Sequence, residues 1–378
     1  MEFRIARGDL AEAVGRAARA LPARTPVPVL GGLLLTAQEG RLTVSGSDFE
    51  TTARVRAEAE VGVAGRVLVL GRRLLDICRV VPEGPVSCAL EGARFTVEAD
   101  GTRFGLSTLP YEEYPALPEA PPEYGAVDAE AFATAVGQVA VAAGRDDTLP
   151  ALTGVRLRLD GEEMTLSASD RYRYAVRRLE WKPRAGSAGE PVEVLVPARR
   201  LLETARGLAR CGSARVLLDP GAGPAAGAGT VGFEGGGART LLRRLEGRLP
   251  GYGALFELPG ASVAEVEAAA LTEAVRRVAV VAEANSPVRL DFAAADGSLL
   301  VRAGYGDDVA AQRLPAVLRG AGEASVAFDP AYLLDALNSF ECPGLRIELL
   351  GAGQRALLVG TGAAAAHQHL LMSLKQLV

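Results

Sequence analysis

Residues 360–366, GTGAAAA, resemble a nucleotide-binding motif. They follow the apolar run ALLV and fit the GxGxxA pattern of a dinucleotide-binding loop. That fingerprint needs a following helix, a second strand and an acidic residue about 20 positions further on. The chain has 378 residues, so the acidic position would lie beyond its last residue. We therefore exclude a dinucleotide site here, and we expect the glycine-rich stretch 221–229 to be a hairpin loop.

The side chains that could bind a metal are few and scattered. On a strand His367 and His369 would face the same side, but no third ligand lies nearby, so we expect both at the surface. The paired aspartates 146–147 and 307–308 are expected to be solvated loop carboxylates. No cysteine belongs to a CxxC pair, so we predict neither zinc sites nor disulfides; the cysteines are Cys78, Cys88, Cys211 and Cys342.

These features leave no basis for catalysis, because neither histidine lies beside a serine or cysteine motif and no carboxylates form a recognisable pair. We predict no catalytic residue, no cofactor and no metal.

The formal net charge is −5, which is the wrong sign for a protein coated in nucleic acid but does not exclude a local basic surface. The first residues are charged early and lack an apolar run, so we expect no signal peptide, and no apolar run in the sequence approaches a membrane span of roughly 18 residues. We expect a cytoplasmic protein.

The elements that would position these side chains follow a pattern that occurs three times. Two strands joined by a turn are predicted over 28–55, 150–176 and 286–312. A strand that runs into a helix follows at 66–84, 193–212 and 325–344, and each helix carries two leucines followed by Asp or Glu. Amphipathic helices with an Asp or Thr cap near the start precede the hairpins, over 9–21, 128–143 and 271–284. Further alternating strands end each module.

The repeat predicts three α+β domains of similar design. The spacing of the paired leucines, from Leu74 to Leu201 to Leu333, shows that each repeat has the size of a domain. Prolines crowd the segment 111–126, which we predict to be the first linker, and 250–262 is predicted to be the second. We place the domain boundaries at 1–122, 123–256 and 257–378.

Several stretches resemble the bacterial sliding clamp, the beta subunit of DNA polymerase III. They are PVLGGLLL (28–35), LLDICR (74–79), FGLSTLP (104–110) and ASDRYRYAV (168–176), and the arginine-rich motifs look most like those of actinobacterial members. The resemblance covers essentially the whole chain. It implies a ring of two chains joined head to tail, with helices lining the hole and antiparallel sheets outside. Such a ring tethers the replicative polymerase to double-stranded DNA, without sequence preference, and catalyses no reaction.

The resemblance also implies where the chain meets DNA. Arg24, Arg72, Arg73 and Arg145 match positions where family members touch DNA, although Arg145 replaces a polar residue. A sliding ring needs sequence-independent attraction for phosphates, which arginines on the helices would supply. The predicted DNA-binding set is Arg24, Arg72, Arg73, Arg145, Arg199, Arg200, Arg276 and Arg277. A solvated helix face is the alternative for each of them.

Two further surfaces follow from the resemblance. The dimer interface is expected at Phe104 and Leu106 on one side and at Val280 and Val281 on the other, unless these are ordinary core residues. Polymerases, the clamp loader and other partners are expected to insert a short peptide with apolar anchors into a groove between modules 2 and 3. The predicted groove residues are Leu152, Ser169, Tyr172, Arg173, Tyr174, Pro250, Leu255, Ala356, Leu370, Met372, Ser373 and Leu374. Core packing is the alternative for Leu152 and Leu255, and a surface aromatic for Tyr172.

The C-terminus departs from the family pattern, in which Met-Pro-Met-Arg-Leu or Met-Pro-Val-Arg-Leu forms part of the groove. Here Ser373 replaces the proline and Lys375 the arginine, and Gln376 displaces the apolar end. One hypothesis is a second, specialised clamp whose altered groove excludes a clamp-directed antibiotic. The plainer interpretation is sequence drift in a housekeeping clamp. A clamp-derived binding module that no longer loads on DNA, and a nucleotide-dependent oxidoreductase, are the alternatives from other classes.

Overall fold

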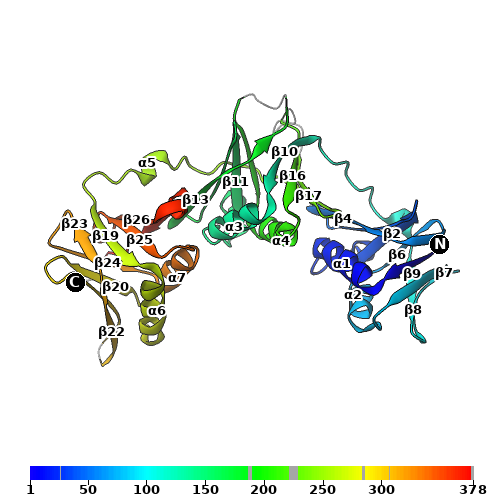
Figure 1. Cartoon of the computed structure of the whole chain (residues 1–378), viewed down its shortest axis with the longest axis horizontal. Helices are drawn as coiled ribbons and strands as arrows, with labels where there is room; N and C mark the ends of the chain where they lie inside the picture. The colour runs from blue at the N-terminus through cyan, green and yellow to red at the C-terminus, as the bar shows by residue number, and fades with distance from the viewer. Residues whose placement is uncertain (26, 186–189, 221–228, 283–285, 306, 376–378) are drawn as a thin grey trace. The chain divides into compact units, whose positions relative to one another are not determined.

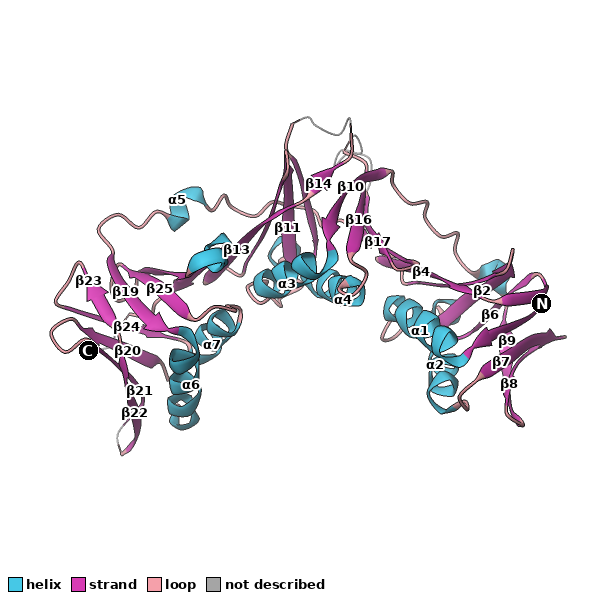
Figure 2. Ribbon diagram, in the orientation of Figure 1, coloured by secondary structure: helices cyan, strands magenta, loops and turns pink. Residues whose placement is uncertain are grey.

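The structure is a computed structural model that describes the chain except for residues 26, 186–189, 221–228, 283–285, 306 and 376–378. Its contacts divide the chain into two compact units. Unit 1 comprises residues 1–130, 182–188 and 203–244, and unit 2 comprises 131–181, 189–202 and 245–378. The division falls within helices α3 (Ala129–Ala140) and α4 (Ala198–Leu208). Figures 1 and 2 label and colour the elements.

Within its described residues, unit 1 is built on one antiparallel sheet of fourteen strands. In sheet order they are β14 (Lys182–Pro183), β10 (Glu123–Asp128), β16 (Ser213–Leu218), β17 (Thr230–Gly235), β18 (Ala238–Arg243), β4 (Thr51–Glu58), β3 (Arg41–Ser47), β2 (Gly32–Gln38), β6 (Gly65–Leu70), β9 (Thr102–Leu109), β8 (Arg94–Ala99), β7 (Pro85–Glu91), β1 (Glu2–Ala6) and β5 (Glu60–Val63). Helices α1 (Arg7–Ala17) and α2 (Gly71–Val80) contact each other. Short 3-10 helices accompany them, namely η1 (Ala18–Ala20), η2 (Pro28–Gly31) and η3 (Tyr111–Glu113).

The described part of unit 2 contains a nine-stranded and a four-stranded antiparallel sheet. The first runs β15 (Val192–Pro197), β11 (Gly154–Asp160), β12 (Glu163–Ser169), β13 (Arg173–Glu180), β27 (His367–Met372), β26 (Arg355–Gly360), β25 (Gly344–Leu349), β19 (Ser262–Glu267) and β23 (Val317–Arg319). The second runs β22 (Asp308–Pro315), β21 (Ser298–Tyr305), β20 (Val288–Ala293) and β24 (Glu323–Phe328). The helices are α5 (Gly253–Phe256), α6 (Ala268–Val278) and α7 (Pro330–Asn338), with η4 (Pro150–Thr153), η6 (Ala279–Val281) and η7 (Gly362–Ala366). Helices α6 and α7 lie side by side (Figure 2).

The three predicted hairpins are confirmed as β2–β3, β11–β12 and β20–β21. In the first, Glu39 and Gly40 both have positive φ, 51° and 70°, as a tight two-residue hairpin turn requires. The amphipathic helices are also confirmed. Helix α1 buries Leu10, Ala13, Val14 and Ala17, and helix α6 buries Leu271, Ala274, Val275 and Val278, at the same helical spacing. Each helix thus covers its sheet with one apolar stripe.

The expected caps are wrong for α1 and α6. Asp9 lies inside the first turn of α1, whose N-cap position is Ala6 without a side-chain hydrogen bond. Helix α6 is capped by Glu267, whose side chain accepts a hydrogen bond from the Ala270 N–H at 2.9 Å. In both cases a strand, β1 or β19, runs directly into the helix. The end of the strand therefore fixes the cap position.

The stretch GTGAAAA is not placed like a dinucleotide-binding loop, although its sequence fits the GxGxxA pattern. It spans the end of β26 and η7, which connects two antiparallel neighbours in the sheet, β26 and β27. A dinucleotide-binding loop instead joins a strand to a helix in a parallel βαβ unit. Within the described residues, no helix is both long and apolar enough to cross a bilayer. The hairpin predicted over 221–229 lies almost entirely outside the described residues.

Candidate partner groove, basic surface and dimer surface

The predicted groove residues lie in unit 2, most of them around strands β13 and β27. Tyr174 pairs with Leu370 in the ladder between these strands, and Ala356 of β26 pairs with Leu371 on the other side of β27. Because directly paired residues of neighbouring strands point to the same side, Tyr174 and Leu370 share one face of the sheet. On that face they form an apolar cluster with Leu258, against which Leu255 packs. The segment 250–262, predicted to be a linker, is thus partly packed on the sheet through α5 and the residues after it.

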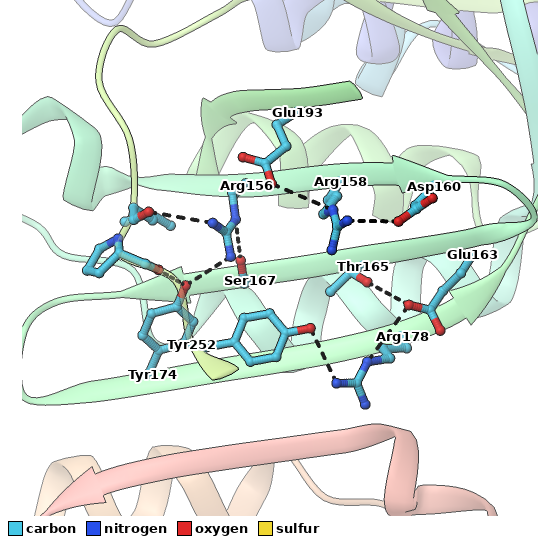
Figure 3. Close-up of polar contacts among 12 residues, drawn as sticks. Arg156, Arg158, Asp160, Glu163, Thr165, Ser167, Tyr174, Arg178, Glu193 and Tyr252 are labelled. Carbon is cyan, nitrogen blue, oxygen red and sulfur yellow. Dashed lines mark hydrogen bonds and ion pairs between the residues drawn. The ribbon is translucent and has the colours of Figure 1, made fainter. Parts of the chain in front are cut away.

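Tyr174 holds the loop before α5 on the sheet (Figure 3). Its hydroxyl donates to the Pro250 carbonyl oxygen at 2.8 Å, and Arg156 of β11 donates to that hydroxyl at 3.3 Å. The ring of Tyr252 lies with its centroid 6.1 Å from that of Tyr174, and the Arg178 guanidinium lies 5.7 Å from the Tyr252 centroid. Burial raises the pKa of Tyr174. These contacts fix the backbone that presents Pro250 and Leu255.

A charge cluster centred on a buried arginine lies at the start of β13. Arg173 is only 4% exposed and pairs with Asp170 at 2.8 Å and with Asp335 of α7 at 2.8 Å. Its guanidinium also lies 4.4 Å from the centroid of the Tyr332 ring. Ser169 donates to the Arg173 carbonyl oxygen at 2.8 Å. Arg173 therefore fixes the turn before β13 against helix α7.

The predicted groove residues differ widely in exposure. Tyr172, Met372 and Leu374 are 59%, 39% and 41% exposed, and the Met372 N–H donates to the Tyr172 carbonyl oxygen at 2.8 Å. Pro250 is exposed, and Leu255 is half-buried. Leu152 is half-buried on η4, which contacts β11 and β12. The buried members are Ser169, Arg173, Tyr174, Ala356, Leu370 and Ser373.

Sequence reasoning missed several residues that hold this site together. They are Arg156, Asp170, Tyr252, Phe256, Tyr332 and Asp335. Asp335 carried a signal, because it is the acidic residue of the repeated Leu-Leu-Asp pattern. Its partner could not be inferred, since Arg173 lies 162 positions away in the chain.

The predicted DNA-binding arginines occur in both units. In unit 1 the side chain of Arg72 donates to the carbonyl oxygen of Ala23 at 2.8 Å. Ala23 directly precedes Arg24 in the sequence. Arg24, Arg72 and Arg73 are exposed, as are Arg145, Arg199, Arg276 and Arg277 in unit 2, whereas Arg200 is half-buried. On α6, Arg276 pairs with Glu273, and Arg277 lies 3.5 Å from the Gln312 side-chain oxygen. Arg276 and Arg277 therefore already have polar partners within the chain.

The predicted interface residues lie at two strand edges or beside them. Strand β9 pairs with β8 from Thr102 to Ser107, but with β6 only at Thr108 and Leu109. Phe104 and Leu106 lie where β9 has only one described neighbour, and both pack partly on the core of unit 1. Val280 is 83% exposed on η6, which contacts β22, the outer strand of the four-stranded sheet. Val281 packs partly on the core of unit 2.

The expectation of surface histidines is wrong. His367 and His369 are both 0% exposed. Strand β27 is paired on both sides, with β13 and β26, and its odd-numbered residues through Leu371 are buried on one face of the sheet. His367 Nδ1 lies 3.2 Å from the Val176 carbonyl oxygen and its Nε2 lies 2.8 Å from Ser339 Oγ. Burial lowers the pKa of His367 to about 4 and that of His369 well below its usual value.

The cysteines and the possible metal ligands are the remaining side chains whose chemistry was considered in the sequence. The four cysteines are free thiols, and burial raises the pKa of Cys78 to about 11 and that of Cys88 to about 12. Both thiols are thus far less acidic than a reactive cysteine. Within the described ranges, no three His, Cys, Asp or Glu side chains are placed to share a metal ion.

Repeated α+β modules of helices and antiparallel sheets, with exposed arginines on helices such as α2 and α6, are typical of the sliding-clamp class. Comparison with known proteins agrees. Residues 1–118, 126–251 and 258–374 match the N-terminal, central and C-terminal domains of the DNA polymerase III beta subunit. The chain belongs to this family, the bacterial sliding clamps.

Individual relatives match nearly the whole length of the chain. The chain is 48% identical over 381 residues to the beta sliding clamp of Streptomyces coelicolor, with 99% of each chain covered. It is 40% identical over 368 residues to the beta sliding clamp homolog GriR of Streptomyces muensis, covering 97% of this chain and 95% of that one. The sliding clamp of Pseudomonas aeruginosa, solved bound to griselimycin, has the same fold with a TM-score of 0.90 at 23% identity and full coverage of both chains.

Proposed function

We propose that two copies of this chain join head to tail into a ring around double-stranded DNA and tether the replicative polymerase, the clamp loader and other peptide-bearing partners. The observation that carries the proposal is the family match in all three modules. The ring would act in the cytoplasm and catalyse no reaction. We further propose the module boundaries 1–122, 123–256 and 257–378.

The decisive test is topological. The protein is loaded onto a nicked circular duplex with a bacterial clamp loader and ATP, and the DNA-bound fraction is isolated by gel filtration. Retention on the circle, followed by loss when a restriction enzyme linearises it, is the expected result, because a ring slides off a free end. Failure to be retained on the circle would favour a clamp-derived module that does not load.

The arginines of α6 supply the first prediction. Changing Arg276 and Arg277 together to glutamine is expected to reduce the slope of log affinity against log salt by about 2, since each neutralised phosphate contributes about 0.9. Affinity for a short duplex is measured at several salt concentrations. The matched control changes Arg158 and Arg346, which are 42% and 47% exposed on strands, and should leave the slope unchanged. Equal slopes in both variants would remove α6 from the DNA surface.

The dimer surface supplies the second prediction. We propose that the free edge of β9 in one copy meets β22 and η6 of the other. Val280→Asp places a charge on a side chain that is 83% exposed in the single chain, so the fold should survive. Burying this charge without a partner should raise the dimer dissociation constant at least about 100-fold, as sedimentation velocity would detect. Val317→Asp, at a residue 48% exposed on β23, is the control. An unchanged dimer would contradict the assignment.

A second candidate function is a specialised clamp whose groove excludes a clamp-directed antibiotic. It is favoured by Ser373, whose backbone N–H donates to the Gln354 carbonyl oxygen at 2.9 Å. A proline, which family members typically carry there, has no N–H to donate. Griselimycin is a suitable probe, because it is bound in the solved Pseudomonas aeruginosa clamp. Equal griselimycin affinity for this chain and for the Streptomyces coelicolor clamp would rule this candidate out.

A further inference from the structure

The segment that follows β27 is held by hydrogen bonds to three other segments of unit 2. The Met372 N–H donates to the Tyr172 carbonyl oxygen at 2.8 Å, the Ser373 N–H to that of Gln354 at 2.9 Å and the Leu374 N–H to that of Ala327 at 2.7 Å. The Gly353 N–H returns a bond to the Leu374 carbonyl oxygen at 3.1 Å. Three successive backbone donors are thus satisfied. We call Ser373–Lys375 the tail and residues 351–354 the turn.

The side chain of Ser373 joins the tail to the turn. It is 6% exposed, and its Oγ lies 2.9 Å from the Gly351 carbonyl oxygen and 2.8 Å from that of Gln354. The same oxygen accepts a hydrogen bond from the Gln354 N–H at 3.0 Å. A hydroxyl has one hydrogen to donate, so it can donate to only one of the two carbonyl oxygens at a time. It can accept the hydrogen bond from the Gln354 N–H in either case.

The turn is shaped to receive the tail. Gly353 has φ +72°, and a Cβ built on it would lie 2.7 Å from Lys375 Cγ. A side chain at position 353 would therefore be strained by its backbone and would push against the tail. Gly353 in the turn and Ser373 in the tail together allow the turn and the tail to lie close to each other.

The consequence falls on the two neighbours of Ser373. In an extended segment alternate residues face the same side, so Met372 and Leu374 lie opposite the buried hydroxyl. They are 39% and 41% exposed, although the backbone N–H of each is hydrogen-bonded. The backbone bond from Met372 also ties them to Tyr172, which is 59% exposed. We call these three exposed side chains, which stand on hydrogen-bonded backbone, the rim.

We infer that Ser373 is a positioning residue for partner binding: its hydroxyl bonds hold Met372 and Leu374 in place as a preformed rim for a short peptide with apolar anchors. This inference rests on the proposed function of the groove. Preformed apolar side chains bind more tightly because less conformational freedom is lost on binding. The proline of other family members could not make either the N–H or the hydroxyl bond, so this chain orders its rim by a different device.

The experiment compares the unaltered full-length chain with Ser373→Ala and Ser373→Thr. Binding of a fluorescein-labelled hexapeptide with leucine and phenylalanine anchors is measured by fluorescence anisotropy. Hydrogen exchange is followed in the peptic fragments that contain the turn and the tail. Ser373→Ala is expected to weaken peptide binding about five- to tenfold and to speed exchange in both fragments, since it removes the hydroxyl bonds. Ser373→Thr keeps the hydroxyl and should restore both.

The outcomes separate the inference from the groove itself. Equal peptide affinity and equal exchange in the unaltered chain and Ser373→Ala would overturn the inference and leave the groove standing. No binding by the unaltered chain would overturn the proposed groove, and the inference with it. If Ser373→Ala fails to fold, Gly353→Ala displaces the tail from the turn without touching Ser373, and it should weaken binding by a similar factor. Unchanged binding in Gly353→Ala would also contradict the inference.

Discussion

Replacing Arg173 by methionine is expected to lower the free energy of unfolding by about 3–5 kcal/mol, the usual effect of removing one partner from a buried ion pair. Arg173 is 4% exposed and Asp170 is 10% exposed, so the substitution leaves a carboxylate that water cannot fully reach. The contact with Tyr332 and the bond to Asp335 on α7 are lost with it. Chemical denaturation followed by circular dichroism measures the change.

Arg178→Met is the matched control for this prediction. Arg178 lies on the same strand, is 38% exposed and is 3.8 Å from its carboxylate partner, Glu163. Exposed pairs of this kind contribute at most about 1 kcal/mol. Arg173→Lys adds a second comparison. Lysine keeps the positive charge but lacks the planar guanidinium group, whose several N–H donors reach Asp170 and Asp335 together. A loss in Arg173→Met no larger than that of the control would show that the cluster does not stabilise the fold.

The chain is also expected to lose stability steeply as the pH falls from about 6.5 to 4. The pKa of His367 is about 4 in the folded chain, below its value near 6.5 when unfolded. In this window the unfolded state therefore binds more protons, and the stability rises with pH and falls on acidification. His367 alone should contribute a loss of about 3 kcal/mol across the window. The pKa of His369 is lowered in the same direction, with Arg173 adding to the effect of burial.

Two variants separate the histidines. Neither ring nitrogen of His369 has a hydrogen-bond partner within the described residues, and both are buried, so His369→Leu is expected to be neutral or stabilising at pH 7. It should also make the dependence of the unfolding free energy on pH less steep below 6.5. His367→Asn tests the other ring and should lose stability at pH 7, because His367 bonds to Ser339 and Val176. Unchanged pH dependence in both variants would exclude the histidines as the acid-sensitive groups.

The contrast between the hairpins and the histidines shows what a sequence can predict here. Turn residues and alternating strands are local signals, and the threefold repeat made them visible, so the hairpins and the helices α1 and α6 were found. The burial of His367 and His369 depends on β27 being flanked by β13 and β26. That placement is decided by strands far away in sequence. A polar HxH pair next to apolar residues gives no sign of it.

The site was predicted unevenly for the same reason. Family motifs named Tyr174, Arg173 and Ser373, but their bonding partners are Pro250, Asp335 and the turn at 351–354, all brought together by the fold. The replacement of proline at Ser373 was evident from the sequence. That its N–H and hydroxyl would both be used could not be known before the turn was seen beside it.

The ladders β18–β4 and β13–β27 each join strands from different predicted modules, and this has a consequence for how the chain folds. Val55 pairs with Ala238, and Arg173 with Leu371, so the partners in each ladder are separated by nearly 200 residues. Pairing over such distances is slow compared with the closure of a local hairpin. The local hairpins and helices are therefore expected to form first, and these two ladders last. Until then β4 and β13 present unpaired edges, and this interval is when copies of the chain are most prone to pair wrongly with one another.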